Sequence, residues 1–122
     1  MAGIARSRET ALEMARLLEE GKGEDTVVLA LGELSSFTDY FLIATVRSSV
    51  HLSGLARRIA GFLKERDLKA LYPRKRVTAK GWLVMDCGDI VVHLMEKDVR
   101  AFYDLEHLWF RAERISYSSK SS

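Results

Sequence analysis

The sequence lacks the features that define several specialised classes of protein. A single cysteine, Cys87, excludes an internal disulfide framework and a metal site built from several cysteines. No apolar run approaches the roughly 18 residues that a membrane-spanning helix needs. The opening residues, MAGIARSRET, also lack the apolar core of a secretory signal. We therefore expect a soluble, cytoplasmic protein that does not act at a membrane.

An excess of one charge is also missing. The chain has 19 basic and 17 acidic residues, a net charge of +2, and the two signs are interspersed along most of its length. Domains whose main work is to grip phosphates usually have a clear basic excess. One dense basic cluster, Arg74-Lys75-Arg76, is interpreted as a solvated loop. Contact with RNA phosphates or with an acidic partner is the alternative, although three charges are few for binding nucleic acid.

The 122 residues suffice for one domain, which we place at residues 1–110 and expect to be followed by a polar, mobile tail at residues 111–122. Apolar residues at helical spacing predict an amphipathic helix over residues 8–20. Ser7 can cap the start of this helix, and Gly21 can adopt the left-handed conformation just past its end.

Two almost wholly apolar runs follow. Residues 26–31 are rich in β-branched side chains and predict a buried strand. Residues 40–46 are too few for most helices and are typical of a strand that is covered on both faces, so helices must lie on either side of the sheet. The next segment supplies such a helix, with a cap at Ser48 or Ser49 and an apolar stripe that reaches Arg66.

The segment from Trp82 to Trp109 organises the rest of the chain. Its pattern predicts a hairpin of two strands, Trp82–Met85 and Ile90–Met95, around a turn in which Gly88 has a positive φ. Asp98 can then cap a closing helix. The apolar stripe expected on that helix consists of Phe102, Leu105, Leu108 and Trp109.

The order of the predicted elements indicates the fold class. A less clear strand over residues 68–72 precedes Pro73, which should end that strand or place it at a sheet edge. The elements then follow the order helix, strand, strand, helix, strand, strand, strand, helix. This order predicts one α/β domain with a mixed sheet of about five strands and helices packed on it.

Residues that could carry chemistry are scattered. His51, His93 and His107 have no spacing typical of metal ligands, and His93 is expected to pack against a neighbouring backbone group or carboxylate. No GxSxG turn, P-loop or GxGxxG cradle is present. Asp86 and Asp89 are the best candidates for metal-assisted phosphoryl chemistry. The more ordinary explanation of this pair is the preference of aspartate for turns.

The closing segment is unusually aromatic and acidic, with Tyr103, Asp104, Glu106, His107 and Trp109 close together in sequence. Aromatic side chains beside carboxylates suit a protein–protein interface, where rigid rings provide much of the binding energy. Part of the same helix must instead plug the core. Composition alone favours neither role, and both can hold on different faces of one helix.

The sequence resembles the ribosomal silencing factor family, known as RsfS or Iojap, over roughly residues 8–110. The most specific part is residues 82–109, where a strand led by tryptophan, a turn and an acidic, aromatic helix follow one another. The matching positions there are Trp82, Asp86, Gly88-Asp89, His93, Arg100, Tyr103, Leu105-Glu106 and Leu108-Trp109. A second signature consists of Thr38-Asp39-Tyr40, Ser48-Ser49 and His51.

This resemblance implies a non-enzymatic factor, without a cofactor, that binds ribosomal protein uL14 on the large ribosomal subunit. Seated there, it would block joining of the small subunit and repress translation when nutrients are limiting. The resemblance also implies a sheet of nucleotidyltransferase-like topology without the catalytic apparatus, and a homodimer of the free chain. The expected docking residues are Trp82, Asp86, Tyr103, Glu106 and Trp109, because carboxylates would meet basic side chains and rings would form the desolvated centre.

Two other functions stay open. One is a metal-dependent nucleotidyltransferase that uses Asp86 and Asp89. The other is a small RNA-binding module that works through the basic cluster together with Arg57 and Arg58. In the leading hypothesis a direct contact with ribosomal RNA would be secondary to the contact with uL14.

The chain departs from the family pattern at two places. Val46 stands where the family usually has a glycine after the second strand. Lys75-Arg76 stands where the family usually has a Glu-Gly pair ahead of the tryptophan-led strand. The second departure reverses a charge in a segment expected near the partner surface.

Overall fold

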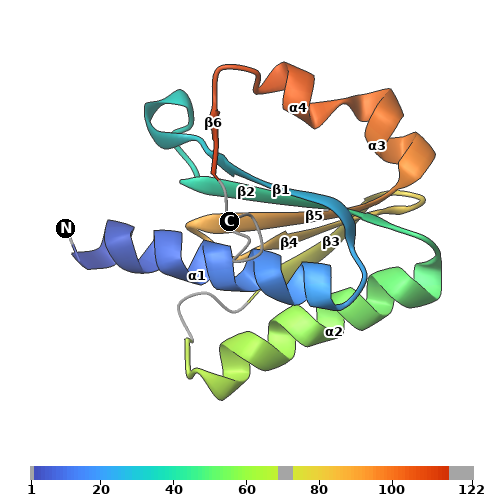
Figure 1. Ribbon diagram of the computed structural model, residues 1–122, viewed down its shortest axis with the longest axis horizontal. Helices are drawn as coiled ribbons and strands as arrows, with labels where there is room; N and C mark the ends of the chain where they lie inside the picture. The colour runs from blue at the N-terminus through green and yellow to red at the C-terminus, as the bar shows by residue number, and fades with distance from the viewer. Residues whose placement is uncertain (1, 69–72, 116–122) are drawn as a thin grey trace.

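A computed structural model describes residues 2–68 and 73–115, with side chains from Ser7 onward. Six strands form one mixed sheet in the order β3-β4-β5-β2-β1-β6, with helices on both faces (Figure 1). The elements are α1 (Ala2–Glu20), β1 (Glu24–Ala30), a 3-10 turn (Gly32–Leu34), β2 (Tyr40–Val46), α2 (Ser49–Glu65), β3 (Arg74–Ala79), β4 (Trp82–Asp86), β5 (Ile90–Glu96), α3 (Lys97–Tyr103), α4 (Leu105–Leu108) and β6 (Glu113–Arg114). The predicted α/β class is confirmed, with one strand more than expected.

The sheet is covered on both faces by helices. In Figure 1, α1 and α2 lie on one side of the sheet, and α3 and α4 lie on the other. Every residue of β2 is buried, because its alternate side chains enter two different cores. Leu42 and Ala44 pack among residues of α1 and α2, whereas Phe41 and Ile43 pack in the cluster beneath α4. The prediction that residues 40–46 form a strand covered on both faces is therefore confirmed.

The first helix begins before the predicted residue 8, so the expected cap is wrong. Ser7 lies inside α1, where it is buried and its hydroxyl donates to Asp89 Oδ2 at 3.1 Å. The left-handed residue after the helix is Lys22, with φ 73°, and not Gly21. Gly21 is needed for space instead, because a Cβ there would lie 2.5 Å from Cδ2 of Leu55 on α2.

The second helix and the hairpin agree with the sequence predictions. Ser48 caps α2 by accepting a hydrogen bond from the backbone N–H of His51 at 3.1 Å. In the turn between β4 and β5, Gly88 has φ 80° and its N–H donates to Asp86 Oδ1 at 3.0 Å. These interactions are local in sequence, which is why the pattern of residues was enough to predict them.

The basic cluster is a strand and not the loop that was predicted. It forms the first half of β3, which directly follows Pro73 and lies at the edge of the sheet. The strand predicted over residues 68–72 falls on 69–72, outside the described residues, and Leu68 itself is not in a strand.

The closing helix is broken in two. Its cap is Glu96, not Asp98, and Asp104 takes a left-handed conformation with φ 48° that separates α3 from α4. Because of this break, the residues of the expected apolar stripe do not share one buried face. Leu105 is buried, but Phe102 and Leu108 are 80% and 70% exposed.

The ordered fold also continues beyond residue 110. The two residues of β6 pair with β1, and Ile115 is buried in the core on the α1–α2 side. Part of the segment assigned to a polar tail therefore belongs to the sheet. The expectation for residues 116–122 lies outside the described part of the chain.

Candidate functional site

Rings from the sheet and from the closing helices meet on the α3–α4 side. They are Phe41 on β2, Trp82 on β4, His93 on β5, Tyr103 at the end of α3 and Trp109 just after α4, and we call them the aromatic cluster. The strands present these rings on one face because alternate residues of a strand point to the same side.

Ring contacts connect the whole aromatic cluster. The Trp82 ring lies 4.6 Å from the Tyr103 ring and 5.8 Å from the His93 ring, measured between centroids. Phe41 continues the series, with its centroid 4.6 Å from that of His93 and 5.6 Å from that of Trp109. Three of the predicted docking residues, Trp82, Tyr103 and Trp109, are thus brought together, and tilted pairs of this kind are favourable.

These three residues differ in how far they reach solvent. Trp82 is only 9% exposed, whereas Tyr103, which lies over it, is 44% exposed. Trp109 is half-buried against Phe41. Trp82 is therefore mainly the floor of the aromatic cluster, and Tyr103 is the ring that reaches solvent above it.

The buried His93 is part of this floor. Its Nδ1 accepts a hydrogen bond from the indole Nε1–H of Trp82 at 3.1 Å, so its partner is an indole and not the backbone group or carboxylate that was predicted. The neutral ring then carries its proton on Nε2, which has no hydrogen-bond partner in the described part of the chain. Burial, and secondly the positive charge of Arg76, lower the pKa of His93 to about 4.

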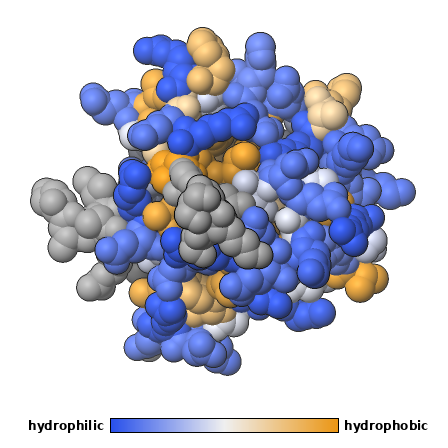
Figure 2. Space-filling view, in the orientation of Figure 1, coloured by the Kyte–Doolittle hydropathy of each residue, from blue (hydrophilic) through white to orange (hydrophobic). Residues whose placement is uncertain are grey.

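Exposed apolar side chains extend the aromatic cluster to solvent. The Phe102 ring meets the Tyr103 ring edge-on at 5.0 Å, and the Phe37 ring lies 6.3 Å from that of Phe41. Phe37, Phe102, Leu108 and Phe110 are all mostly exposed, and we call them the exposed rim. Figure 2 shows apolar side chains standing singly among polar ones on the α3–α4 side of the molecule.

Part of the exposed rim was not found from sequence. Phe37 lies in a serine-rich loop and Phe110 follows the last helix, so neither belongs to a periodic pattern. Phe102 and Leu108 were predicted only as members of an apolar stripe on one continuous helix, because the apolar pattern does not reveal the break at Asp104. The signal that was present is the unusual density of aromatic residues after position 101.

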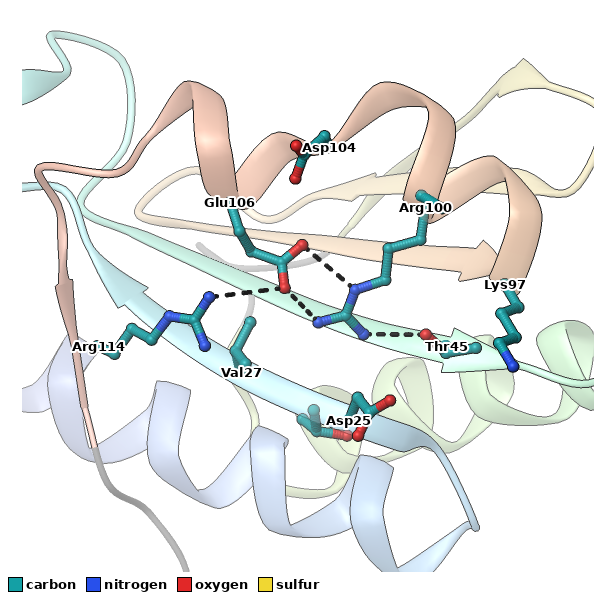
Figure 3. Close-up of a pocket in the computed structure, with 10 residues that line it drawn as sticks. Asp25, Val27, Thr45, Lys97, Arg100, Asp104, Glu106 and Arg114 are labelled. Carbon is teal, nitrogen blue, oxygen red and sulfur yellow. Dashed lines mark hydrogen bonds and ion pairs between the residues drawn. The ribbon is translucent and has the colours of Figure 1, made fainter.

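Glu106 lies in an internal ion-pair network, not on an open surface. Arg100 reaches from α3 to meet it, with Nη2 at 2.7 Å and Nε at 3.3 Å from the two carboxylate oxygens (Figure 3). Arg100 Nη1 also donates to Thr45 Oγ1 at 2.9 Å, and Arg114 of β6 approaches Glu106 to 3.9 Å. This network fastens α3, α4 and β6 to the ends of β1 and β2.

The network lines a pocket of about 530 Å³ between β1, the end of β2 and the closing helices. Burial by itself raises the pKa of Glu106, but the hydrogen bond and charge of Arg100 and the charge of Arg114 together outweigh it, so the pKa is lowered. Glu106 is thus an ionised carboxylate whose charge is balanced by two arginines within the fold.

The two aspartates of the hairpin do not point to a common site. Asp86 holds the N–H of Gly88, and Asp89 accepts from Ser7. Asp86 is exposed but lies roughly 13 Å along β4 from Trp82, given the rise per residue of a strand. Within residues 2–68 and 73–115, no group of three or more His, Cys, Asp or Glu could hold a metal ion.

Two further features bear on function. Cys87 is buried, and burial, with the nearby charge of Asp86, raises the pKa of its thiol to about 12, so it is a poor nucleophile.

Among the described residues, no helix has both the length and the apolar character that crossing a bilayer requires.

Comparisons with known proteins agree on one family. A family model named RsfS, described as "Ribosomal silencing factor during starvation", matches residues 4–122. The ribosomal silencing factor RsfS of Halalkalibacterium halodurans is 31% identical over 110 residues, which cover 89% of this chain and 93% of that protein. The mitochondrial Iojap-related protein of Arabidopsis thaliana is 29% identical over 113 residues, covering 88% of this chain and 61% of that protein.

A solved structure has the same fold. The crystal structure of a protein from Chromobacterium violaceum superposes with a TM-score of 0.76 at 28% identity, and the match covers 94% of each chain.

The environment of His93 predicts a loss of stability in acid. Its pKa is about 4 in the folded chain and about 6.5 when exposed, so between these values only the unfolded chain takes up the proton. We expect the free energy of unfolding to fall by about 2 kcal/mol from this group between pH 8 and pH 5. Urea unfolding of His93→Gln should show a shallower pH dependence, because glutamine can accept from Trp82 without titrating. The exposed His107→Gln is the control, and equal slopes in both variants would contradict the prediction.

The ion pair of Arg100 and Glu106 predicts a second effect on stability. We expect Glu106→Gln to lower the free energy of unfolding by about 1–3 kcal/mol, because the mostly buried guanidinium loses its charged partner. The matched control is Glu13→Gln, whose carboxylate pairs with the exposed Arg66 and should contribute less than about 1 kcal/mol. Chemical denaturation of both variants at pH 7 measures the difference, and similar losses would refute this role.

Proposed function

This chain belongs to the ribosomal silencing factor family, and on that premise we propose that it acts by binding ribosomal protein uL14 on the large ribosomal subunit. The bound protein would occupy the space that the small subunit needs, and translation would fall when nutrients are limiting. The observation that carries this proposal is the family match over residues 4–122. The mechanism is steric, so we propose that the chain is not an enzyme.

The aromatic cluster and the exposed rim are the proposed docking surface. Binding energy at protein interfaces concentrates in a few aromatic side chains that lose their water on contact. Tyr103 and Phe102 combine large exposed area with a rigid support, because Tyr103 packs on the buried Trp82. A rigid ring needs little ordering on binding, which favours affinity.

The carboxylates have different parts in this proposal. Asp86 is exposed at the far end of β4 and can meet a basic side chain of the partner. Glu106 acts indirectly, because its pair with Arg100 holds the break between α3 and α4 and so positions Tyr103 and the exposed rim.

No observation favours the nucleotidyltransferase alternative as a second function. Asp86 and Asp89 each bind a different group of the fold, as aspartates at turns commonly do. Retention by ribosomal particles, without turnover of a nucleotide, is the behaviour that the steric mechanism requires.

Two further points follow from the same proposal. The chain would work in the cytoplasm, where it meets large subunits. When free, it would form a homodimer, and a dimer that covered the docking surface would compete with the ribosome for it.

We predict that the purified chain lowers the yield of joined ribosomes when it is added to separated subunits, because it covers the joining surface. Sedimentation in a sucrose gradient measures this yield. Unchanged joining at saturating protein would refute the proposed function.

The docking surface is tested by Tyr103→Ala and Phe102→Ala. Each should weaken capture of uL14 by the tagged chain, by about 30-fold for a residue that contributes 2 kcal/mol. Val50→Ala is the control, because Val50 is an exposed apolar residue on α2, on the other side of the sheet. Trp82 is avoided because its burial would mix loss of folding with loss of binding. Equal binding by all three variants would contradict the assignment of the contact to α3.

A further inference from the structure

The edge strand β3 has an unusual surface. Five of its six residues are exposed, and only Ala79 is half-buried. It pairs with β4 on one side only, so its other side is the outer edge of the described sheet. Charged residues on an edge strand commonly protect that strand from pairing with other strands. In β3, a register shift between Val77 and Ala79 already interrupts the regular backbone.

The strand geometry distributes the three positive charges over both faces of this edge. Arg76 pairs with Val84, whose side chain lies in the cluster with Trp82, so Arg74 and Arg76 stand on the α3–α4 side. Lys75 pairs with Met85, which belongs to the core on the α1–α2 side. Arg74 and Arg76 are roughly 7 Å apart along the strand and repel each other.

These charges also lack the internal partners that other arginines have. Arg47, Arg58, Arg66, Arg100 and Arg114 each lie within 4 Å of a glutamate oxygen. None of the three basic residues of β3 forms an ion pair with another residue in the described part of the chain. The carboxylate of Asp86 stands opposite Arg74 in the register and offsets part of this repulsion without forming an ion pair, and an external polyanion would relieve the rest.

We propose that Arg74, Lys75 and Arg76 form a contact site for the phosphate backbone of RNA at the free edge of β3. The proposal rests on the proposed function in one respect: the RNA is that of the large subunit, beside the docking surface. Arg76 connects the two regions, since it lies on the same face of the sheet as Trp82.

The observations favour phosphates over an acidic protein strand. An added strand needs a regular ladder of free backbone groups, and the shift near Val77 disrupts it. Guanidinium groups match phosphate oxygens in a forked geometry, and no aromatic ring stands on β3 to stack a base. The site would thus hold the RNA backbone without reading its sequence.

The dependence of binding on salt tests this site. The edge variant carries Arg74→Ala, Lys75→Ala and Arg76→Ala together, and its affinity for isolated large subunits is compared with that of the unaltered chain between 50 and 200 mM salt. Three phosphate contacts on single-stranded RNA contribute about 2 to the slope of log affinity against log salt. The edge variant should lose that contribution, so the salt-induced loss of affinity becomes about 16-fold smaller over this range.

A control with the same change in charge separates a local site from general electrostatics. Arg8→Ala, Lys22→Gln and Lys64→Ala together remove three exposed charges from α1, the turn after it and α2. This control should keep the slope, and Arg74→Lys with Arg76→Lys should keep it too. An unchanged slope in the edge variant, or an equal loss in the control, would overturn the proposal. The thermal midpoint of the edge variant should not fall, because its altered side chains are exposed and unpaired.

A second measurement distinguishes failure of this site from failure of the proposed function. If the unaltered chain does not bind large subunits, the proposed function fails. Binding to a single-stranded ribosomal RNA fragment at low salt still tests the edge, and it should be lost in the edge variant and kept in the control. Displacement by polyglutamate but not by RNA would overturn the proposal in favour of an acidic protein partner.

Discussion

The parallel pairing of β2 with β5 joins the two halves of the sheet. Seven residue pairs run in register from Tyr40 with Ile90 to Val46 with Glu96. The strands before this seam and the hairpin after it meet nowhere else within the described sheet. Because both strands are covered on both faces, the seam requires helices on each side. Val46 is buried at the end of the seam, where it packs in the core on the α1–α2 side.

The parts of the fold that were predictable from sequence are those whose cause is local. The apolar run of β2, the Ser48 cap of α2 and the Gly88 turn each depend on residues close in sequence. The break at Asp104 depends instead on Arg100 meeting Glu106 and Thr45, and β6 forms only because β1 offers an edge. Such partners are distant in the chain, and periodicity carries no information about them.

The same distinction applies to the site. Trp82, Tyr103 and Trp109 were chosen as large aromatic residues in one segment, and the fold does gather them. Glu106 was expected on an open face because the sequence does not show that its two arginine partners, which lie on other elements, reach it. The charges of β3 were placed in a loop, although their number and order were visible. The types of residue thus indicated the chemistry of the site, and only the strand pairing showed on which face and edge of the sheet those residues lie.

Both tryptophans of the chain belong to the aromatic cluster. When excitation selects tryptophan over tyrosine, the emission of the protein therefore comes from one side of the sheet. The indole N–H of Trp82 is hydrogen-bonded to an imidazole, and its ring lies beneath a half-exposed tyrosine. A partner that settled on Tyr103 would change the polarity around that indole, so the chain carries its own optical reporter of occupancy, without an added dye.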